Sequence, residues 1–294
     1  MRNSWPLLPV LIIMFASFAA HSGQSVEPKI IEHGPRGSNK IALTFDACPT
    51  GREDEYDEKV VHVLLKEKVP ATLFMSGRWV EKNTDVAKSL AANPQFEIAN
   101  HAFWHPHMLE KDDERILREL KRTQEIIRKV TGKRPKYFRP PFGEVDDRLA
   151  KLAAEAGLVT VQYDIASGDP DPDLSAKRIV RGVVGDAKGG SIVVFHMNEN
   201  GLRTAEVLSE VIRQLREKGF ELVTVGEMLK RPDTETRRHG DRENRKKPEV
   251  RTGSTAASQA VSASSSTEHS ASSSTAAGPD LRSSDGSTTP AAEK

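Results

Sequence analysis

The chain has 294 residues, and its 43 lysines and arginines nearly balance 42 aspartates and glutamates, for a formal net charge of +1. We therefore expect no nucleic-acid partner, because such partners demand a basic surplus. The single cysteine, Cys48, excludes an internal disulfide, so stability has to come from a hydrophobic core or a bound metal ion.

The first 22 residues have the pattern of a signal peptide. Arg2 precedes an uncharged stretch from Leu7 to Ala20, and small residues around Ala20 and Ser22 suit a signal peptidase. The alternative is a membrane anchor, but the stretch is shorter than the roughly 20 apolar residues that cross a bilayer. We expect an exported protein, periplasmic or extracellular, with no membrane attachment after cleavage.

Both flanks of the central region differ from it in composition. Residues 23–39 form an N-terminal extension, and residues 232–294 are rich first in charges of both signs and then in Ser, Thr and Ala. Such a tail buries too little apolar surface to offset the entropy lost on ordering, so we expect it to be disordered. Residues 40–231 remain as one domain, long enough for a sizeable core.

Short apolar runs alternate with helical patterns through this central region, which is typical of β/α units around a parallel sheet. The clearest helical pattern runs from Ile116 to Val130 and ends at Gly132. Seven strands favour a barrel over a small open sheet. The predicted strands are Ile41–Phe45, Ala71–Met75, Phe96–Ala99, Tyr137–Arg139, Val159–Tyr163, Ser191–His196 and Glu221–Val225.

Several polar residues fall at or just beyond the carboxyl ends of these predicted strands. In a parallel β/α barrel, those ends gather on one rim, where active sites are built. We therefore expect side chains that are far apart in the sequence to converge. They are Asp46, His101, His105, Arg139, Asp169 and His196.

The pair His101 and His105 can present two imidazoles to one metal ion if the intervening segment forms a compact turn. The simpler alternative is two ordinary loop histidines. Asp46 ends an apolar strand, where a carboxylate needs a cation or a hydrogen-bond donor to offset its desolvation. A metal ion or Arg139 would supply one; taken alone, Asp46 is better explained as a helix-cap or turn residue.

Arg139 and His196 each end a predicted strand with a side chain suited to catalysis. Two prolines follow Arg139 and stiffen the backbone, which suits a residue that positions others. The imidazole of His196 is the side chain best matched to proton transfer near neutral pH.

The segments TFDACP, HAFWH, RPPFG, YDIASGDP and IVVFH follow one another in this order. Together they resemble the five motifs of the polysaccharide deacetylase family, the NodB-homology or carbohydrate esterase 4 group. The resemblance implies a deformed (β/α)7 barrel over residues 40–231. It also implies a hydrolase of carbon–nitrogen bonds other than peptide bonds, which removes N-acetyl groups from a cell-wall or extracellular polysaccharide containing N-acetylglucosamine-type units.

The resemblance also implies catalytic roles for individual residues. Asp46 would be the general base, oriented by Arg139, and His196 would be the general acid. Asp169 would pair with His196, and Asp164 would replace it if the fourth motif were aligned in a different register.

A divalent metal ion is the cofactor that the resemblance implies. His101 and His105 would hold it together with Asp46, while Pro140 and Phe142 would contact the substrate. Zinc is the expected metal, and cobalt, nickel and manganese are alternatives, because histidine and carboxylate ligands suit all four.

The sequence departs from the family pattern at two positions. The family usually has two adjacent aspartates in its first motif, one the base and the other the third metal ligand, but Ala47 stands at the second, and Pro170 replaces a common tryptophan. The third metal ligand is therefore open: we predict Asp46 first and a carboxylate of the following acidic loop, such as Asp57, second. Cys48 is the third alternative, with a simpler explanation as a small residue under a turn.

Two other functions remain as alternatives: a hydrolase of another non-peptide amide, which would have a closed pocket, and a catalytically inactive barrel that binds glycan. Loss of the second aspartate favours the inactive barrel. Retention of Asp46, Arg139, Asp169 and His196 favours an enzyme, because a binding module has no need for these groups at neighbouring strand ends. We expect a monomer whose partner is a polysaccharide.

Overall fold

The structure is a computed structural model that describes residues 26–49 and 56–230. These residues belong to one compact unit of the chain, Met1–Asp233. The predicted signal peptide (residues 1–22) and the predicted tail (residues 232–294) lie outside the described residues.

One sheet forms the centre of the molecule, and every strand pair in it is parallel. Over the described residues its nine strands are β1 (Ile30–Ile31), β2 (Lys40–Ala47), β3 (Ala71–Met75), β4 (Phe96–Asn100), β5 (Tyr137–Phe138), β6 (Val159–Val161), β7 (Ile165–Ala166), β8 (Ile192–His196) and β9 (Glu221–Val223).

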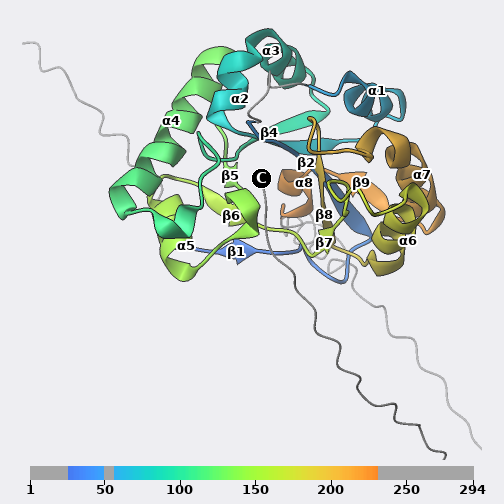
Figure 1. Ribbon diagram of the computed structural model, residues 1–294. Coiled ribbons are helices and arrows are strands. Elements are labelled where there is room, and N and C mark those ends of the chain that lie inside the picture. The colour runs from blue at the N-terminus through green and yellow to red at the C-terminus, as the bar shows by residue number, and fades with distance from the viewer. Residues whose placement is uncertain (1–25, 50–55, 231–294) are drawn as a thin grey trace, which may run out of the picture. The chain divides into compact units, whose positions relative to one another are not determined.

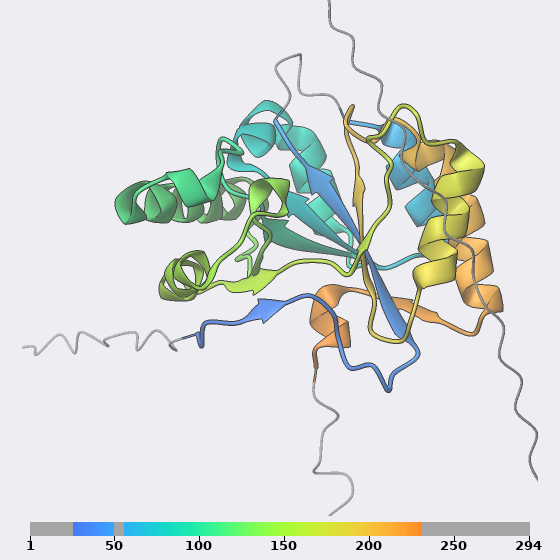
Figure 2. The ribbon, with the colours of Figure 1, turned by 60° about the horizontal axis from the view of Figure 1, so that its bottom comes forward.

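The strand order is β1-β6-β5-β4-β3-β2-β8-β7, with β9 paired to β2 beyond this path. The sheet curls into a half-barrel, which confirms the predicted deformed barrel of the NodB-homology type (Figures 1 and 2). On one edge of β2, β9 pairs with its first residues and β3 with its last, while β8 occupies the other edge. Strand β2 is therefore the most enclosed strand of the sheet.

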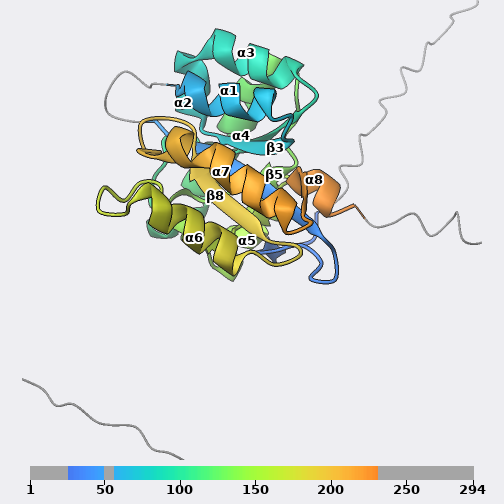
Figure 3. The same cartoon turned by 90° about the vertical axis from the view of Figure 1, so that its right-hand side faces the viewer.

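Most helices surround the strands on the outside of the curl, whereas the last one, α8 (Val225–Met228), lies within it and places Val225 and Met228 in the same apolar cluster as Ala42 (Figure 1). In the described residues the other helices are α1 (Glu58–Lys66), α2 (Gly77–Lys82), α3 (Thr84–Ala92), α4 (Asp113–Thr131), α5 (Asp147–Glu155), α6 (Ala176–Asp186) and α7 (Thr204–Glu217), with 3₁₀ turns at Met108–Glu110 and Pro141–Gly143. Helices α6 and α7 lie side by side (Figure 3).

Local sequence accounts for the ends of the longest helix. The Asp112 side chain accepts a hydrogen bond from the Arg115 backbone amide at the start of α4, and Gly132 adopts a left-handed φ of 73° at its end. Both are common helix-end devices, because they satisfy backbone groups that the helix itself leaves unpaired. None of the helices in the described ranges has the length and apolarity needed for a membrane span.

Strand β2 alternates its side chains between two apolar regions, as a pleated strand must. Ala42 joins a cluster on the concave face, and Asp46 shares that face by alternation. The side chains that join the large cluster beneath the helices are those of Ile41, Leu43, Phe45 and Ala47.

All seven predicted strands are present; β3 has the predicted bounds, and the others have shifted ends. Strand β6 stops at Val161, and β9 stops at Val223 because Thr224 already caps α8. Two strands were not predicted, β1 and β7, since two residues are too short to show a periodic pattern. Because β1 pairs with β6, part of the predicted N-terminal extension belongs to the sheet.

Candidate active site

The strand register brings the predicted site residues together at the carboxyl end of the sheet. Asp46 on β2 lies directly opposite His196 on β8. Ala47, Met75, Asn100 and Phe138 are paired from strand to strand across β2, β3, β4 and β5. The residues that follow them, among them Cys48, His101 and Arg139, therefore share the next level of the sheet.

A cavity of about 280 Å³ opens at this level. Pro140 and Phe142, the predicted substrate contacts, form part of its wall. The polar side chains that line it and could take part in chemistry are Asp46, Cys48, His101, His105, Arg139 and His196.

Asp46 is buried and forms an ion pair with Arg139, whose Nη1 donates to Asp46 Oδ1 at 2.7 Å. The Arg139 guanidinium also lies over the Phe74 ring, 4.0 Å from its centroid. Burial alone would raise the pKa of Asp46, but Arg139, His101 and His196 together hold it below its ordinary value. Asp46 is therefore an ionised carboxylate, the form that accepts a proton.

His196 is held by a second buried carboxylate. Its Nδ1 lies 3.2 Å from Asp169 Oδ1, and its backbone amide donates to Asp169 Oδ2 at 2.8 Å. The hydroxyls of Ser167 and Thr204 also donate to Asp169, at 2.6 and 2.5 Å. Burial would lower the pKa of His196, yet the Asp169 hydrogen bond and the charges of Asp169 and Asp46 raise it above its ordinary value.

His101 and His105 face each other with ring centroids 4.9 Å apart. The Arg139 carbonyl oxygen can only accept, so His101 Nδ1 donates to it at 2.8 Å, which leaves Nε2 with a free lone pair. Burial lowers the pKa of both rings, and for His105 burial and the neighbouring His101 bring it to about 3. Both imidazoles are therefore neutral, the form that binds metals.

Cys48 completes a cluster with these two histidines. In the described part of the chain, one group of potential metal ligands has all its donor atoms within 4.8 Å of one another, and it comprises Cys48, His101 and His105. Cys48 Sγ lies 3.5 Å from His101 Nε2. Burial and the Asp46 charge raise the pKa of this thiol well above its ordinary value.

The structure separates the alternatives that the sequence left open. Asp46, the predicted third ligand, stands outside this cluster, with Oδ2 at 3.8 Å from His101 Nε2. Asp57 caps α1, where its side chain accepts from the Lys59 amide. Asp164 accepts from the Ile192 amide, whereas Asp169 meets His196, so the predicted register of the fourth motif fits the geometry.

Glu119 is a site residue that the sequence reasoning missed. This buried carboxylate of α4 accepts hydrogen bonds from the amides of Phe103 and Trp104, at 2.9 and 2.8 Å, inside the turn that joins His101 to His105. A signal was present, because Glu119 lies on the apolar face of α4, where an unpartnered carboxylate would be costly.

Backbone strain also concentrates at the cavity. Ala102, His105 and Phe142 have φ values of 57°, 57° and 59°, in the left-handed region that residues other than glycine rarely adopt. Such conformations persist where surrounding contacts fix them, as they do at many functional sites.

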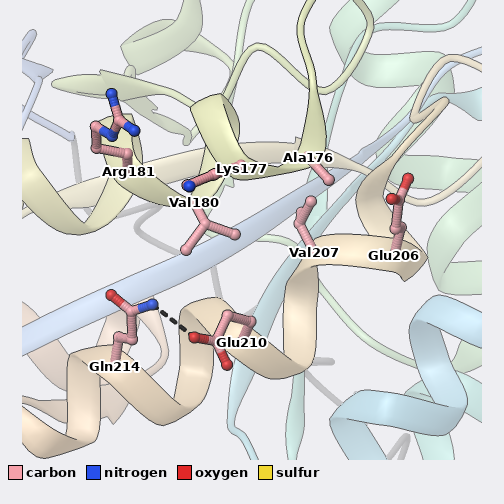
Figure 4. Close-up of a pocket in the computed structure, with 8 residues that line it drawn as sticks. All are labelled: Ala176, Lys177, Val180, Arg181, Glu206, Val207, Glu210 and Gln214. Atoms are coloured by element: carbon pink, nitrogen blue, oxygen red, sulfur yellow. Dashed lines mark hydrogen bonds between the residues drawn. The ribbon is translucent and has the colours of Figure 1, made fainter.

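A larger cavity of about 520 Å³ lies between α6 and α7 (Figure 4). Val180 and Val207 lie between its two helices, with Lys177 and Arg181 on α6 and Glu210 on α7. It contains none of the predicted site residues, so the smaller cavity is the candidate active site.

Comparison with known proteins agrees with this geometry. The family model described as polysaccharide deacetylase matches residues 33–161. A peptidoglycan-N-acetylglucosamine deacetylase of Bacillus cereus is 31% identical over 198 residues, which cover 67% of this chain and 70% of that relative.

Two solved structures show the same fold. One is the Bc1960 peptidoglycan N-acetylglucosamine deacetylase, with a TM-score of 0.63 and 30% identity over 68% of this chain and 92% of that one. The other is a mutant, with restored enzymatic activity, of BA3943, a family 4 carbohydrate esterase pseudoenzyme from Bacillus anthracis. It has a TM-score of 0.64 and 27% identity over 70% of this chain and 72% of that one. Motifs, fold and relatives agree, and the chain belongs to the polysaccharide deacetylase family.

Proposed function

We propose that this chain is an active, metal-dependent deacetylase that removes N-acetyl groups from a cell-wall polysaccharide with N-acetylglucosamine-type units. The observation that carries the proposal is that Asp46 and His196 line one cavity, where their surroundings lower the pKa of Asp46 and raise the pKa of His196. Asp46 is kept ionised and His196 is biased towards its protonated form, which is the division of labour that acid–base catalysis requires.

Asp46 is the general base in this proposal. It accepts a proton from the attacking water, while Arg139 keeps the carboxylate in one orientation through the 2.7 Å bond. The ion pair also prevents the buried carboxylate from taking up a proton before the substrate arrives.

His196 is the general acid. Its Nδ1 is tied to Asp169, so Nε2 is the nitrogen available to protonate the leaving amine. The strand register places His196 opposite Asp46, so base and acid act from the same level of the cavity.

The donor set fits a divalent cation, because two neutral imidazoles and a third donor lie within 4.8 Å of one another. His101 and His105 would hold the cation, and when bound it would polarise the acetyl carbonyl and make water a stronger nucleophile. The carbonyl of Arg139 orients the His101 ring for this purpose.

Pro140 and Phe142 are proposed to contact the sugar that carries the acetamido group. Phe142 is 55% exposed, stacks on His107 and meets His105 in an edge arrangement, with ring centroids 4.1 and 4.5 Å away. A fixed, exposed aromatic ring at the rim of a cavity suits the apolar face of a pyranose. An open rim of this kind fits a polymer better than a small amide.

The relatives support a cell-wall substrate, and with it action outside the cytoplasm by an exported protein. The B. cereus relative and Bc1960 both carry the name of a peptidoglycan N-acetylglucosamine deacetylase. Similarity to the BA3943 pseudoenzyme, together with Ala47, favours the second candidate function, an inactive barrel that binds glycan.

Acetate release from a panel of N-acetylated glycans tests the proposal. The panel comprises peptidoglycan, chitin oligomers and an exopolysaccharide, each with the zinc-loaded protein and with a chelated sample. We expect release from at least one glycan and its loss on chelation. Glycan binding without release from any of them would support the inactive barrel instead.

A further inference from the structure

We propose that Cys48 is the third protein ligand of the metal ion, so that the site is built from two histidines and one cysteine. The inference rests on the proposed metal dependence and goes beyond it in naming the ligand. With Cys48 as the third ligand, the general base is not also a metal ligand, because Asp46 remains paired with Arg139.

Strand alternation places Cys48, and not residue 47, towards the cavity. Ala47 is fully buried and belongs to the apolar cluster that also contains Val60 and Leu64 of α1. Asp46 and Cys48, two residues apart, both line the cavity. Ala47 offers no donor atom, whereas the Cys48 thiol lines the cavity.

The spacing of the donor atoms agrees with a tetrahedral site. Zinc–sulfur and zinc–nitrogen bonds of about 2.3 and 2.0–2.1 Å, at a tetrahedral angle, place the two donor atoms about 3.5 Å apart. Cys48 Sγ and His101 Nε2 are 3.5 Å apart. His105 completes the group within 4.8 Å.

Two of the three donors, His101 and Cys48, are held in place by hydrogen bonds around them. His101 is fixed through its Nδ1 to the Arg139 carbonyl. The Asn198 side-chain amide donates to the Cys48 carbonyl at 2.7 Å, and the Ser76 amide donates to the Ala47 carbonyl at 3.1 Å. Cys48 is thus anchored on both sides of its side chain, as a preorganised ligand has to be.

The competing carboxylates in the described residues, Asp46 and Asp57, have other partners, while Glu53, Asp54 and Glu55 lie outside the described residues. Asp46 Oδ1 is engaged by Arg139, and its Oδ2 lies farther from His101 Nε2 than Cys48 Sγ does, at 3.8 Å against 3.5 Å. Asp57 serves as the cap of α1.

A thiolate changes which metals the site prefers. Sulfur is a soft donor, and with two imidazoles it selects zinc or cobalt over manganese, which prefers oxygen ligands. Three protein ligands also leave one tetrahedral position for water or substrate, as catalytic zinc sites do.

The test is a titration of chelator-treated protein with cobalt(II), followed by absorption spectroscopy. Cobalt bound to a thiolate has an intense near-ultraviolet charge-transfer band that nitrogen and oxygen ligands do not produce. We expect the band in the wild type and in Asp46→Asn, the matched control, at one equivalent of cobalt. Cys48→Ser should lose the band and bind cobalt at least about tenfold more weakly.

X-ray absorption of the zinc-loaded wild type provides a readout that needs no variant, with one sulfur expected at about 2.3 Å. A wild type that binds cobalt without the band, or fails to bind it, overturns the proposal. So does Cys48→Ser with unchanged affinity, or Asp46→Asn that no longer binds cobalt.

Acetate release is measured separately on the same samples. The thiolate band without acetate release refutes the proposed deacetylase and leaves the ligand assignment standing. Acetate release without a thiolate band refutes the ligand assignment and leaves the proposed deacetylase standing.

Discussion

Arg139 serves both halves of the site with different atoms. Its guanidinium binds Asp46, and its backbone carbonyl orients His101. Arg139, which follows β5 and precedes Pro140 and Pro141, therefore fixes the proposed base and one proposed metal ligand together.

Arg139→Gln should move the acidic limb of the pH profile of kcat/KM to higher pH. Activity requires ionised Asp46, and Arg139 lowers the pKa of Asp46, so loss of the guanidinium raises that pKa. We expect a shift of about 1–3 pH units, the usual effect of one neighbouring charge. Arg139→Lys, which keeps the charge, should shift the limb less; equal limbs in all three proteins would contradict the assignment.

Asp169→Asn should act on the opposite limb. Activity requires protonated His196 and falls as the pH rises through its pKa, which Asp169 raises. Without that carboxylate the pKa of His196 falls, so the alkaline limb should move to lower pH. Asp164→Asn is the control, because Asp164 contacts Ser191 and Ile192 instead of His196. If the pH profile of Asp169→Asn matches that of the wild type, His196 is not the acid.

Ala47→Asp tests the orientation of β2. The new carboxyl would lie in the cluster beneath the helices, and a pKa raised by about three units at 1.36 kcal/mol each corresponds to a loss of about 4 kcal/mol at neutral pH. Denaturant unfolding should show this loss, with Ala47→Ser as a milder control. A variant of normal stability that binds metal more tightly would mean that residue 47 reaches the cation after all.

Helix α4 shapes the site through one side chain. Its apolar face packs on the core, and Glu119 on that face extends a carboxylate into the turn that carries both histidines. The helix therefore anchors the turn that joins His101 to His105.

Glu119→Ala should lower both stability and metal affinity. It leaves the amides of Phe103 and Trp104 unpaired, at a cost of about 1–3 kcal/mol each, and frees the turn that holds the ligands. Glu119→Gln keeps an acceptor oxygen and should lose less. Calorimetric titration with zinc and thermal unfolding of both variants check this, and unaltered zinc affinity in Glu119→Ala would exclude the role.

Sequence patterns predicted the longer strands well, because runs such as Ala71–Met75 are apolar at every position but Thr72 and are bounded by helical patterns. They missed β1 and β7, whose pairing depends on neighbours distant in the chain. The location of the site followed from residues at strand ends. The position of Cys48 in the cavity was not predicted, because it depends on which face of β2 each side chain occupies. The alternation of side chains along the strand from Asp46 would have indicated it.

In the whole molecule, the curled sheet brings five motifs that are far apart in the sequence to one cavity. Parallel strands all end on the same rim, and their register fixes which residues share a level. The two structural relatives match over 68–70% of this chain, so the fold is shared with them.

The most direct test of the account compares turnover of zinc-loaded wild type with Asp46→Asn and His196→Gln, at equal bound zinc, on N-acetylated peptidoglycan. If Asp46 and His196 are the base and the acid, each variant should keep its zinc and fold but release acetate about 10²–10⁴-fold more slowly. Wild-type rates in either variant, or no acetate from the zinc-loaded wild type, would contradict it.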